Sequence, residues 1–338
     1  MTAASSESTA PRIAVLGSAN MDLVAKAAVL PLPGETVLGQ DFAMVPGGKG
    51  ANQAIAAARA GASCIFLAAI GSDSFGVTLK ARLLASGVDT ALVRVVYGAS
   101  GVAVIMVDGA AENLIVVTPG ANASLLGLSE AELGAIAGAD VLVAQLEVPV
   151  ETVTAAATAA RAAGTRVVLN AAPARDLPPE LLAAVDVLVV NDLEAAALTG
   201  RPVPRPHNFV EVGPSEAVPP ADFDEVGTVA ALLELVPRAV LTRGAAGAWY
   251  AERRTDADSG AVCVHVPAPV VEAVDSTAAG DSFTGALAVA WGEGRELIDA
   301  VRWACAAGAA CVRRLGASSS LPRRAEIDEL YAAAYRNR

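Results

Sequence analysis

The chain has 338 residues and a formal net charge of −12, with 36 acidic residues against 24 basic ones. This acidic balance excludes nucleic acid and anionic membrane as the main partners. Charged or turn residues interrupt every apolar stretch before it reaches the roughly 18 residues of a membrane span. Four cysteines without Cys-x-x-Cys spacing favour free thiols in a reducing cytoplasm over disulfides or a metal site. We expect one cytoplasmic domain over 12–338, preceded by a disordered tail at 1–11 that lacks the pattern of a signal peptide.

Short apolar strands alternate with alanine-rich helices along the chain. The predicted strands lie at 13–17, 64–70, 141–146, 167–170, 187–190 and 240–242. The predicted helices lie at 50–60, 75–86, 151–163, 194–198, 283–291 and 297–312. Continuous apolar strands between helices predict an α/β fold with a doubly wound, mainly parallel sheet covered on both faces. Such sheets bind ligands beyond the carboxyl ends of their strands.

Two regions break this alternation. Segments 23–26 with 36–45, and 93–97 with 101–117, lack intervening helices and are predicted to form the strands of a small β-sheet. The segment 201–224 has six prolines and no helical period. It is predicted to be a solvated insertion, and a flap near a nucleotide is the alternative.

The most informative motif is DSTAAGDSFTGA at 275–286. The small residues Ala278, Ala279 and Gly280 predict a tight turn that opens a helix, whose free N–H groups attract an anion. Asp281 would repel a phosphate at that place. Its presence makes chemical sense if it accepts the proton of a hydroxyl that attacks the phosphate. The alternative is an Asp that only completes the helix N-terminus.

A second glycine-rich motif, PGGKGAN at 46–52, opens another predicted helix. It is not a P-loop, because Gly50 stands where Ser or Thr is required, and not a dinucleotide fingerprint, because Gln53 stands where Gly is required. The motif still offers a close backbone approach, the ammonium of Lys49 and the amide of Asn52. This combination suits the binding of a polyol.

The two motifs resemble the two signature segments of the ribokinase (PfkB) family of carbohydrate kinases. Further blocks in the family's order are GSANMD at 17–22, PGET at 33–36, GAN at 120–122, QLE at 145–147, NAAPA at 170–174, NDLE at 191–194 and TRGAAG at 242–247. The ordered set spans about residues 12 to 325, and the similarity is strongest to the family's ribose kinases. It implies a small β-sheet lid over the sugar, from about 22–45 and 93–118, and a homodimer formed through two such lids.

The resemblance implies ATP-dependent phosphorylation of ribose at O5, which yields ribose 5-phosphate and ADP. Asp281 would be the general base, and the N–H groups of Ala278, Ala279 and Gly280 would stabilise the transferring phosphoryl group. The nearest alternative is a sibling kinase for deoxyribose, a nucleoside or a hexose. The distant alternative is a sugar-binding sensor without catalysis.

The implied sugar site contains acceptors and donors on opposite sides of a polyol. Its residues are Asn20, Asp22, Gly48, Lys49, Gly50, Ala51, Asn52, Glu147 and Asp281. The carboxylates would accept hydroxyl protons, and the amides and Lys49 would donate. Alternatively, Asn20 and Asn52 cap turns or helices, Asp22 is a surface residue, and Lys49 lies near the phosphates.

The implied nucleotide site lies on the side of Asp281 opposite the sugar site. Its residues are Asn191, Glu194, Thr242, Arg243, Gly244, Ala245, Ala246, Gly247, Gly280 and Cys305. Asn191 and Glu194 match the family's motif near the triphosphate and its Mg²⁺, where Glu194 would act through water. Cys305 departs from the polar residue that relatives often have near adenine, which leaves the choice of nucleobase open.

The resemblance also implies a K⁺ site that activates the enzyme. Asp275 and Ser320 would contribute side-chain oxygens. Backbone carbonyls would come from Thr277, Cys311, Arg314 and Gly316. The alternative is that Asp275 caps the turn and Ser320 is solvated.

Overall fold

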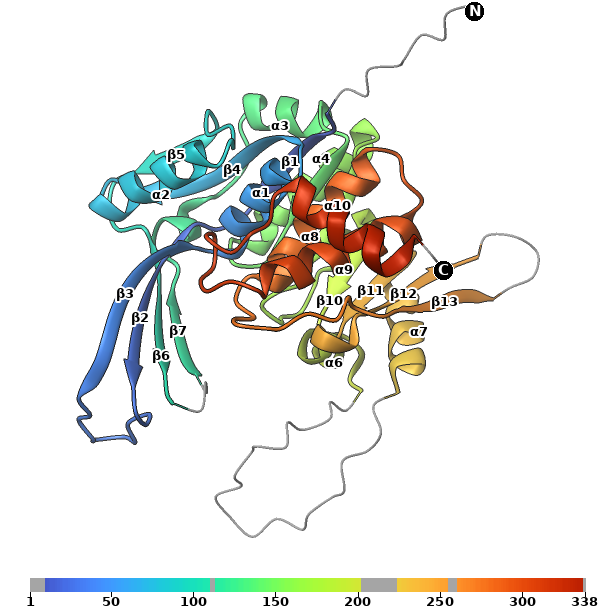
Figure 1. The fold of residues 1–338 in the computed structure, drawn as a ribbon. Coiled ribbons are helices and arrows are strands. Elements are labelled where there is room, and N and C mark those ends of the chain that lie inside the picture. Colours follow the sequence, from blue (N-terminus) through green and yellow to red (C-terminus); the bar gives the residue numbers. More distant parts are fainter. Residues whose placement is uncertain (1–9, 110–112, 202–223, 255–259, 337–338) are drawn as a thin grey trace, which may run out of the picture.

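The computed structural model describes residues 10–109, 113–201, 224–254 and 260–336 (Figure 1). Most of the tail predicted at 1–11 and most of the insertion predicted at 201–224 lie outside these residues. The two ends of the insertion are described, and an ion pair joins them: Arg201 Nη2 lies 2.8 Å from Asp224 Oδ2. Within the described ranges, no helix combines the length and the apolar character that crossing a membrane requires.

The main sheet has nine strands among the described residues, in the order β13-β12-β11-β10-β9-β8-β1-β4-β5. The strands are β1 (Arg12–Leu16), β4 (Ser63–Gly71), β5 (Val93–Val96), β8 (Val141–Ala144), β9 (Arg166–Asn170), β10 (Val187–Val190), β11 (Arg238–Thr242), β12 (Ala248–Arg253) and β13 (Ala261–Val266). All pairs from β11 to β5 are parallel, and β12 and β13 add an antiparallel edge. The predicted α/β fold with a mainly parallel sheet is confirmed.

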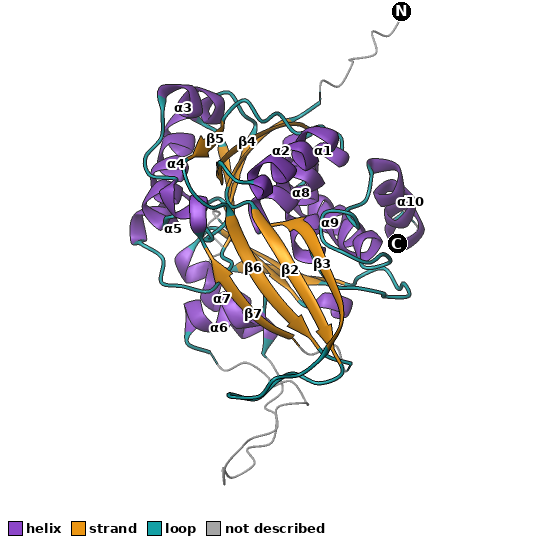
Figure 2. Ribbon diagram, turned by 90° about the vertical axis from the view of Figure 1, so that its left-hand side faces the viewer, coloured by secondary structure: helices purple, strands orange, loops and turns teal. Residues whose placement is uncertain are grey.

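Helices cover both faces of this sheet (Figure 2). One layer contains α1 (Lys49–Arg59), α2 (Ser74–Ala85), α8 (Ala279–Gly292), α9 (Leu297–Cys311) and α10 (Arg324–Tyr335). The other contains α3 (Glu130–Ala137), α4 (Val150–Ala163), α5 (Pro179–Ala184), α6 (Asp192–Thr199) and α7 (Glu225–Leu235). Strand β1 shows why two layers form, because Ile13 and Val15 join one buried core whereas Ala14 and Leu16 join the other.

A second sheet projects from the body of the molecule (Figures 1 and 2). Its order is β3 (Gly39–Gly47), β2 (Asn20–Ala27), β6 (Gly101–Val107), β7 (Asn113–Thr118). The outer pairs are antiparallel, and β2 pairs with β6 in parallel. The sequence interpretation wrongly placed 93–97 in this sheet: β5 instead pairs with β4 at the edge of the main sheet, with Ala68 opposite Val93. Val93 is buried there, which explains the preference for the main sheet.

Candidate active site

The turn before α8 has the conformation that an anion-binding helix end requires. Ala278 is the N-cap and has φ 61°, the one left-handed non-glycine backbone among the described residues. No side chain caps the helix, and Asp281 is buried in its first turn. The Ala279 N–H donates to the Ser276 carbonyl at 3.2 Å, so one of the three predicted phosphoryl-binding amides is engaged within the turn. Asp281 therefore does not serve as the helix cap.

Both carboxylate oxygens of Asp281 face α1. Asn52 Nδ2 donates to Oδ2 at 3.0 Å, and Gln53 Nε2 donates to Oδ1 at 2.9 Å. The two helices approach closely at Gly285, where a Cβ atom would lie 2.8 Å from the Gln53 carbonyl oxygen. Burial raises the pKa of Asp281 above its usual range, while the Lys49 ammonium and the two amide donors oppose the rise.

Glu147 follows β8 and ties together the predicted sugar side. Its Oε2 accepts hydrogen bonds from the Lys49 backbone N–H (3.1 Å), from Asn20 Nδ2 (3.5 Å) and from the Ser18 hydroxyl. Asn20 Oδ1 in turn accepts from Asn122 Nδ2 at 2.7 Å. One oxygen of Glu147 thus holds the opening of α1, together with the Ser18 hydroxyl, which accepts from Gly50 N–H at 3.4 Å. No hydrogen bond to the other Glu147 oxygen is found among the described residues.

The amide of Asn52 has an unsatisfied acceptor. Its Oδ1 is buried and has no hydrogen-bond partner in the described part of the chain. Gly48 precedes it with φ 92°, Gly50 lies against the Gly17 backbone, and Ala51 N–H donates to the Ser18 carbonyl at 2.8 Å. A substrate hydroxyl that donates to Oδ1 would remove the cost of the unpaired oxygen.

The charges of the site are strongly coupled. Burial raises the pKa of Asp22 to about 7, and Glu147 and Asp281 add to this rise. Burial works against the charge of Lys49, yet Asp281, Glu147 and Glu194 together raise the pKa of its ammonium above the usual value. The Lys49 ammonium is thus influenced by carboxylates on both the sugar side and the nucleotide side, so its predicted place beside the sugar and the alternative near the phosphates both stay predictions.

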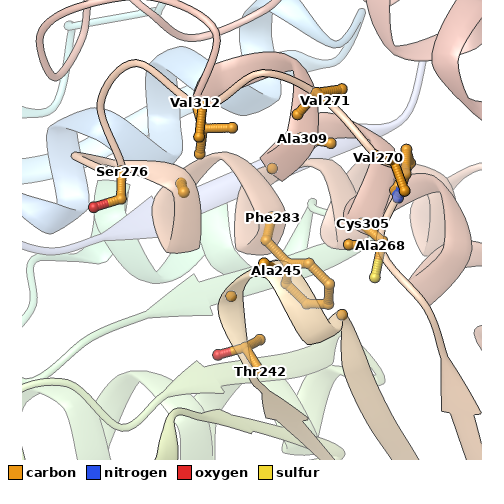
Figure 3. A pocket seen from close by; sticks show the side chains of 16 residues that line it. Thr242, Ala245, Ala268, Val270, Val271, Ser276, Phe283, Cys305, Ala309 and Val312 are labelled. Carbon is orange, nitrogen blue, oxygen red and sulfur yellow. The ribbon is translucent and has the colours of Figure 1, made fainter. Parts of the chain in front are cut away.

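A cavity of about 440 Å³ lies next to the α8 turn (Figure 3). Five predicted nucleotide-binding residues line it: Thr242, Gly244, Ala245, Gly247 and Cys305. Ala279, Phe283 and residues 268–271 of the segment after β13 complete most of the wall. Burial raises the pKa of Cys305 to about 12, so its thiol is neutral and the wall is almost entirely apolar. A flat, apolar group such as a nucleobase fits this lining.

The remaining predicted nucleotide residues bond mainly to protein groups. Asn191 and Glu194 form a capping box at the start of α6: Asn191 N–H donates to Glu194 Oε2 (2.8 Å), and Glu194 N–H donates to Asn191 Oδ1 (2.9 Å). Arg243 pairs with Asp192 (3.0 Å) and Glu225 (2.6 Å). No pattern in the sequence predicts these ion pairs, although the Asn-x-x-Glu spacing is that of a capping box. Burial raises the pKa of Glu194 above its usual value.

Ala246 is not among the residues that line this cavity. Its carbonyl oxygen lies 2.7 Å from His265 Nε2 on β13. This contact attaches the short 3₁₀ turn Gly244–Ala246 to the edge of the main sheet. Ala246 thus connects the predicted nucleotide loop to β13 through its main chain.

The residues predicted for K⁺ lie together beside the α8 turn. Asp275 accepts from Thr277 N–H and from Gly316 N–H, both at 2.8 Å. Cys311 Sγ lies 3.1 Å from Ser320 Oγ and 3.7 Å from the Thr277 carbonyl oxygen. Ser320 is fully buried, so the alternative of a solvated Ser320 is wrong, whereas Asp275 does cap the turn as the alternative held.

The chemistry of this cluster suits a hard monovalent cation. Arg314 Nη2 donates to the Ser320 carbonyl at 3.1 Å and closes the cluster. Burial works against the charge of Asp275, but hydrogen bonds from Thr277 and Gly316 keep the pKa of its carboxyl below the usual value. No group of three or more His, Cys, Asp or Glu side chains that could hold a metal ion occurs within the described ranges. A carboxylate, a hydroxyl and carbonyl oxygens are therefore the available ligands.

Residues 10–324 match the sequence profile of pfkB family carbohydrate kinases. The chain belongs to this family. It is 38% identical over 324 residues to a ribokinase of Haemophilus influenzae, across 94% of this chain and 97% of the relative. It is 36% identical over 322 residues to a ribokinase of Bacillus subtilis, across 94% and 98%. The structure of Arabidopsis thaliana ribokinase complexed with ribose and ATP has a TM-score of 0.81 at 30% identity and covers 96% of this chain and 99% of its own.

Proposed function

We propose that this carbohydrate kinase transfers the γ-phosphoryl group of ATP to O5 of ribose, giving ribose 5-phosphate and ADP. One observation carries the proposal: two amide donors of α1 hold the buried carboxylate of Asp281 in the first turn of α8, and Ala279 and Phe283 of the same helix line the cavity. The relatives named ribokinase, and the ribokinase complexed with ribose and ATP, support ribose and ATP as the two substrates.

In this mechanism Asp281 accepts the proton of the attacking hydroxyl. The two hydrogen bonds from α1 aim its carboxylate, and the opening of α8 presents backbone N–H groups and a positive helix end to the phosphoryl group. Mg²⁺ bound with ATP would offset the charge of the phosphates. Glu194 and Asn191 would hold its water ligands from the start of α6.

The sugar would be recognised by opposed donors and acceptors. Asp22 and Glu147 would accept from its hydroxyls, Lys49 would donate, and the amides of Asn20 and Asn52 would complete the set. A missing hydroxyl would leave one of these buried groups unpaired, which costs about 1–3 kcal/mol. The site thereby favours a sugar with a full set of hydroxyls over its deoxy analogue.

The experiment is an acceptor panel with ATP and Mg²⁺, comparing kcat/KM for ribose, deoxyribose, hexoses and nucleosides. We expect ribose to rank first and Asp281→Asn to lower kcat by about 10²–10⁴-fold. The matched control is Asp176→Asn, an exposed carboxylate outside the site, which should leave kcat unchanged. A higher kcat/KM for another sugar would reject ribose, and full activity of Asp281→Asn would reject the mechanism.

We also propose that Asp275, Ser320 and the nearby carbonyl oxygens of Thr277, Cys311, Arg314 and Gly316 bind K⁺. The ion would add positive charge beside the phosphates and order the turn at Ala278. Activity should be several-fold higher in K⁺ than in Na⁺, and K⁺ should raise the melting temperature of the wild type more than that of Ser320→Ala. Equal rates and equal melting temperatures in both salts would contradict the site.

The outward face of the small sheet is proposed to form a homodimer. Met44, Val104 and Val116 stand in register on this face and are 59%, 43% and 64% exposed. Phe42, one pair further along β3, extends the patch at 60% exposure. Contiguous apolar surface of this kind is typical of a protein–protein contact. We place the working enzyme in the cytoplasm, where ATP is supplied and its free thiols stay reduced.

A further inference from the structure

Two buried glutamines form a network with Asp281: Gln53 supplies one of the two hydrogen bonds from α1, and Gln145 bonds to Gln53. Gln53 on α1 and Gln145 after β8 are both completely buried. Gln145 Nε2 donates to Gln53 Oε1 at 2.5 Å. Gln53 Nε2 donates to Asp281 Oδ1 at 2.9 Å and to Asn170 Oδ1 at 3.0 Å. The four side chains form a line of hydrogen bonds that branches at Gln53 Nε2, with one branch to Asn170 and the other to the proposed base.

Every amide in this line has only one workable orientation. Asn170 Nδ2 donates to the Val189 carbonyl at 3.2 Å, so its Oδ1 must face Gln53. Gln53 then has to present its NH₂ group to two acceptors, and its Oε1 is left for Gln145. Reversing Gln53 would place its oxygen against both Asp281 Oδ1 and Asn170 Oδ1. The line is thus anchored on the main-chain carbonyl of β10 and matches an ionised Asp281.

Helix packing supports the same geometry. Gly285 lies four residues after Asp281 on α8, and a Cβ atom there would approach Ala56 Cβ within 2.7 Å and the Gln53 carbonyl within 2.8 Å. The two helices are therefore close enough for the Gln53 side chain to reach Asp281 directly. Asn52, the neighbouring residue, holds the other oxygen and also faces the sugar side.

We propose that Gln53 is a positioning residue that fixes the carboxylate of Asp281 for proton transfer, and that Gln145 fixes the direction in which Gln53 donates. The inference rests on the proposed function, because it assumes that Asp281 is the base. Gln53 acts through Asp281: among the described residues, the hydrogen bonds of its side chain reach Asp281 and no other side chain of the proposed sugar and nucleotide sites. Its loss should therefore change kcat and the ionisation of Asp281 more than the binding of sugar.

The first experiment compares Gln53→Met, which keeps the size and removes the donor, with Gln145→Met. A matched control is Thr152→Val, which removes a buried hydrogen bond to the Leu125 carbonyl in the opposite helix layer. Gln53→Met should lower kcat about tenfold and shift the acid limb of the pH profile upward by about one pH unit, because a hydrogen bond to the charged form is lost. KM for the sugar should change by less than about twofold. Gln145→Met should change kcat and the acid limb in the same direction but by less. Thr152→Val should change neither kcat nor the acid limb.

The second experiment does not depend on the substrate. The ¹³C shift of the Asp281 carboxyl carbon, assigned with Asp281→Asn, is titrated in the wild type, in Gln53→Met and in Gln53→Glu. Gln53→Glu keeps the bond from Gln145 but adds a carboxyl that competes for the same proton, so its Asp281 titration should lie highest. Unchanged titration and pH profile in both variants, with loss of thermal stability alone as in Thr152→Val, would overturn the proposal. If the wild type fails to phosphorylate ribose, the titration still decides the role of Gln53.

Discussion

Asp22 shows how a half-buried carboxyl can lower the stability of the fold and still serve substrate recognition. Its folded pKa of about 7 lies above the ordinary value of 3.8, chiefly because of burial. The folded protein therefore binds a proton more tightly than the unfolded chain at this position. Its contribution to the free energy of unfolding falls as pH rises from about 4 to 7 and is lowest above that range. A hydrogen bond donated by a substrate hydroxyl would stabilise the ionised form of the Asp22 carboxyl.

This gives a prediction for Asp22→Asn, measured by urea unfolding between pH 5 and pH 8 without sugar. The free energy of unfolding of the variant, minus that of the wild type, should increase with pH up to about 7 and then level off. The control Asp41→Asn removes an exposed carboxylate from the same small sheet and should give a difference independent of pH. A flat difference for Asp22→Asn would show that its carboxyl is not destabilised in the fold. At the same time, Asp22→Asn should raise KM for the sugar at pH 8.

Residue identities alone could predict where the site lies but not all of its contacts. Asn20, Glu147 and Asn191 follow strands that end at one edge of a parallel sheet, so their convergence follows from the fold. The pairing of Gln53 with Asp281 could not be predicted, because it depends on how closely α1 and α8 pack. For the same reason the ion pairs of Arg243 became visible only in three dimensions.

At the scale of elements, two glycines in helix interiors have opposite environments. Gly285 in α8 faces α1 so closely that a Cβ would meet the backbone of its neighbour, at 2.8 Å from the Gln53 carbonyl and 3.0 Å from Ala57 N. Gly134 in α3 has no atom within 4 Å of the same hypothetical position. Intrinsic helix propensity favours alanine at both places by about 1 kcal/mol. Packing should reverse that preference only at Gly285.

We expect Gly285→Ala to lower the free energy of unfolding by about 1–3 kcal/mol, because the helices must separate. It should also lower kcat, since the Gln53–Asp281 contact lengthens. Gly134→Ala, the matched control, should raise the free energy of unfolding by about 0.5–1 kcal/mol and leave kcat unaltered. Urea titrations and initial rates on both variants test this. Equal effects of the two substitutions would mean that the α1–α8 approach is not tight.

Elements with strong periodicity could be predicted from sequence, and marginal ones could not. The six predicted strands and six predicted helices all have counterparts close to the expected bounds. The four-residue β5 was assigned to the wrong sheet, because a short apolar strand carries no information about its partner. The antiparallel strands β12 and β13 were missed, since their apolar runs, at 248–251 and 261–264, are only four residues long.

For the whole molecule, the small sheet determines the expected oligomer. Its strands alternate so that Asp22 lies on the opposite face from the patch with Met44, Val104 and Val116. One sheet would thereby serve two ligands: the sugar on one face and a second copy of the chain on the other. Dimer formation and closure over the sugar would then be mechanically linked.

Replacing Met44 and Val116 together by lysine should convert the dimer to a monomer, because the buried charges would have no partners. Sedimentation velocity measures the change directly. Val77→Lys is the control, since Val77 on α2 is 72% exposed but lies outside the patch. A monomeric wild type, or a double variant that remains dimeric, would refute this interface.

The contact between Arg201 and Asp224 has a consequence for protein engineering. Arg201 follows α6 and Asp224 is the N-cap of α7, and the ion pair holds the two residues close together. We expect the fold to tolerate a second protein sequence inserted between Arg201 and Asp224, because the ends of the insert would lie side by side and neither helix would have to move. This position is thus a suitable insertion site for a reporter or a second domain, and it borders the loop that we assign to ATP.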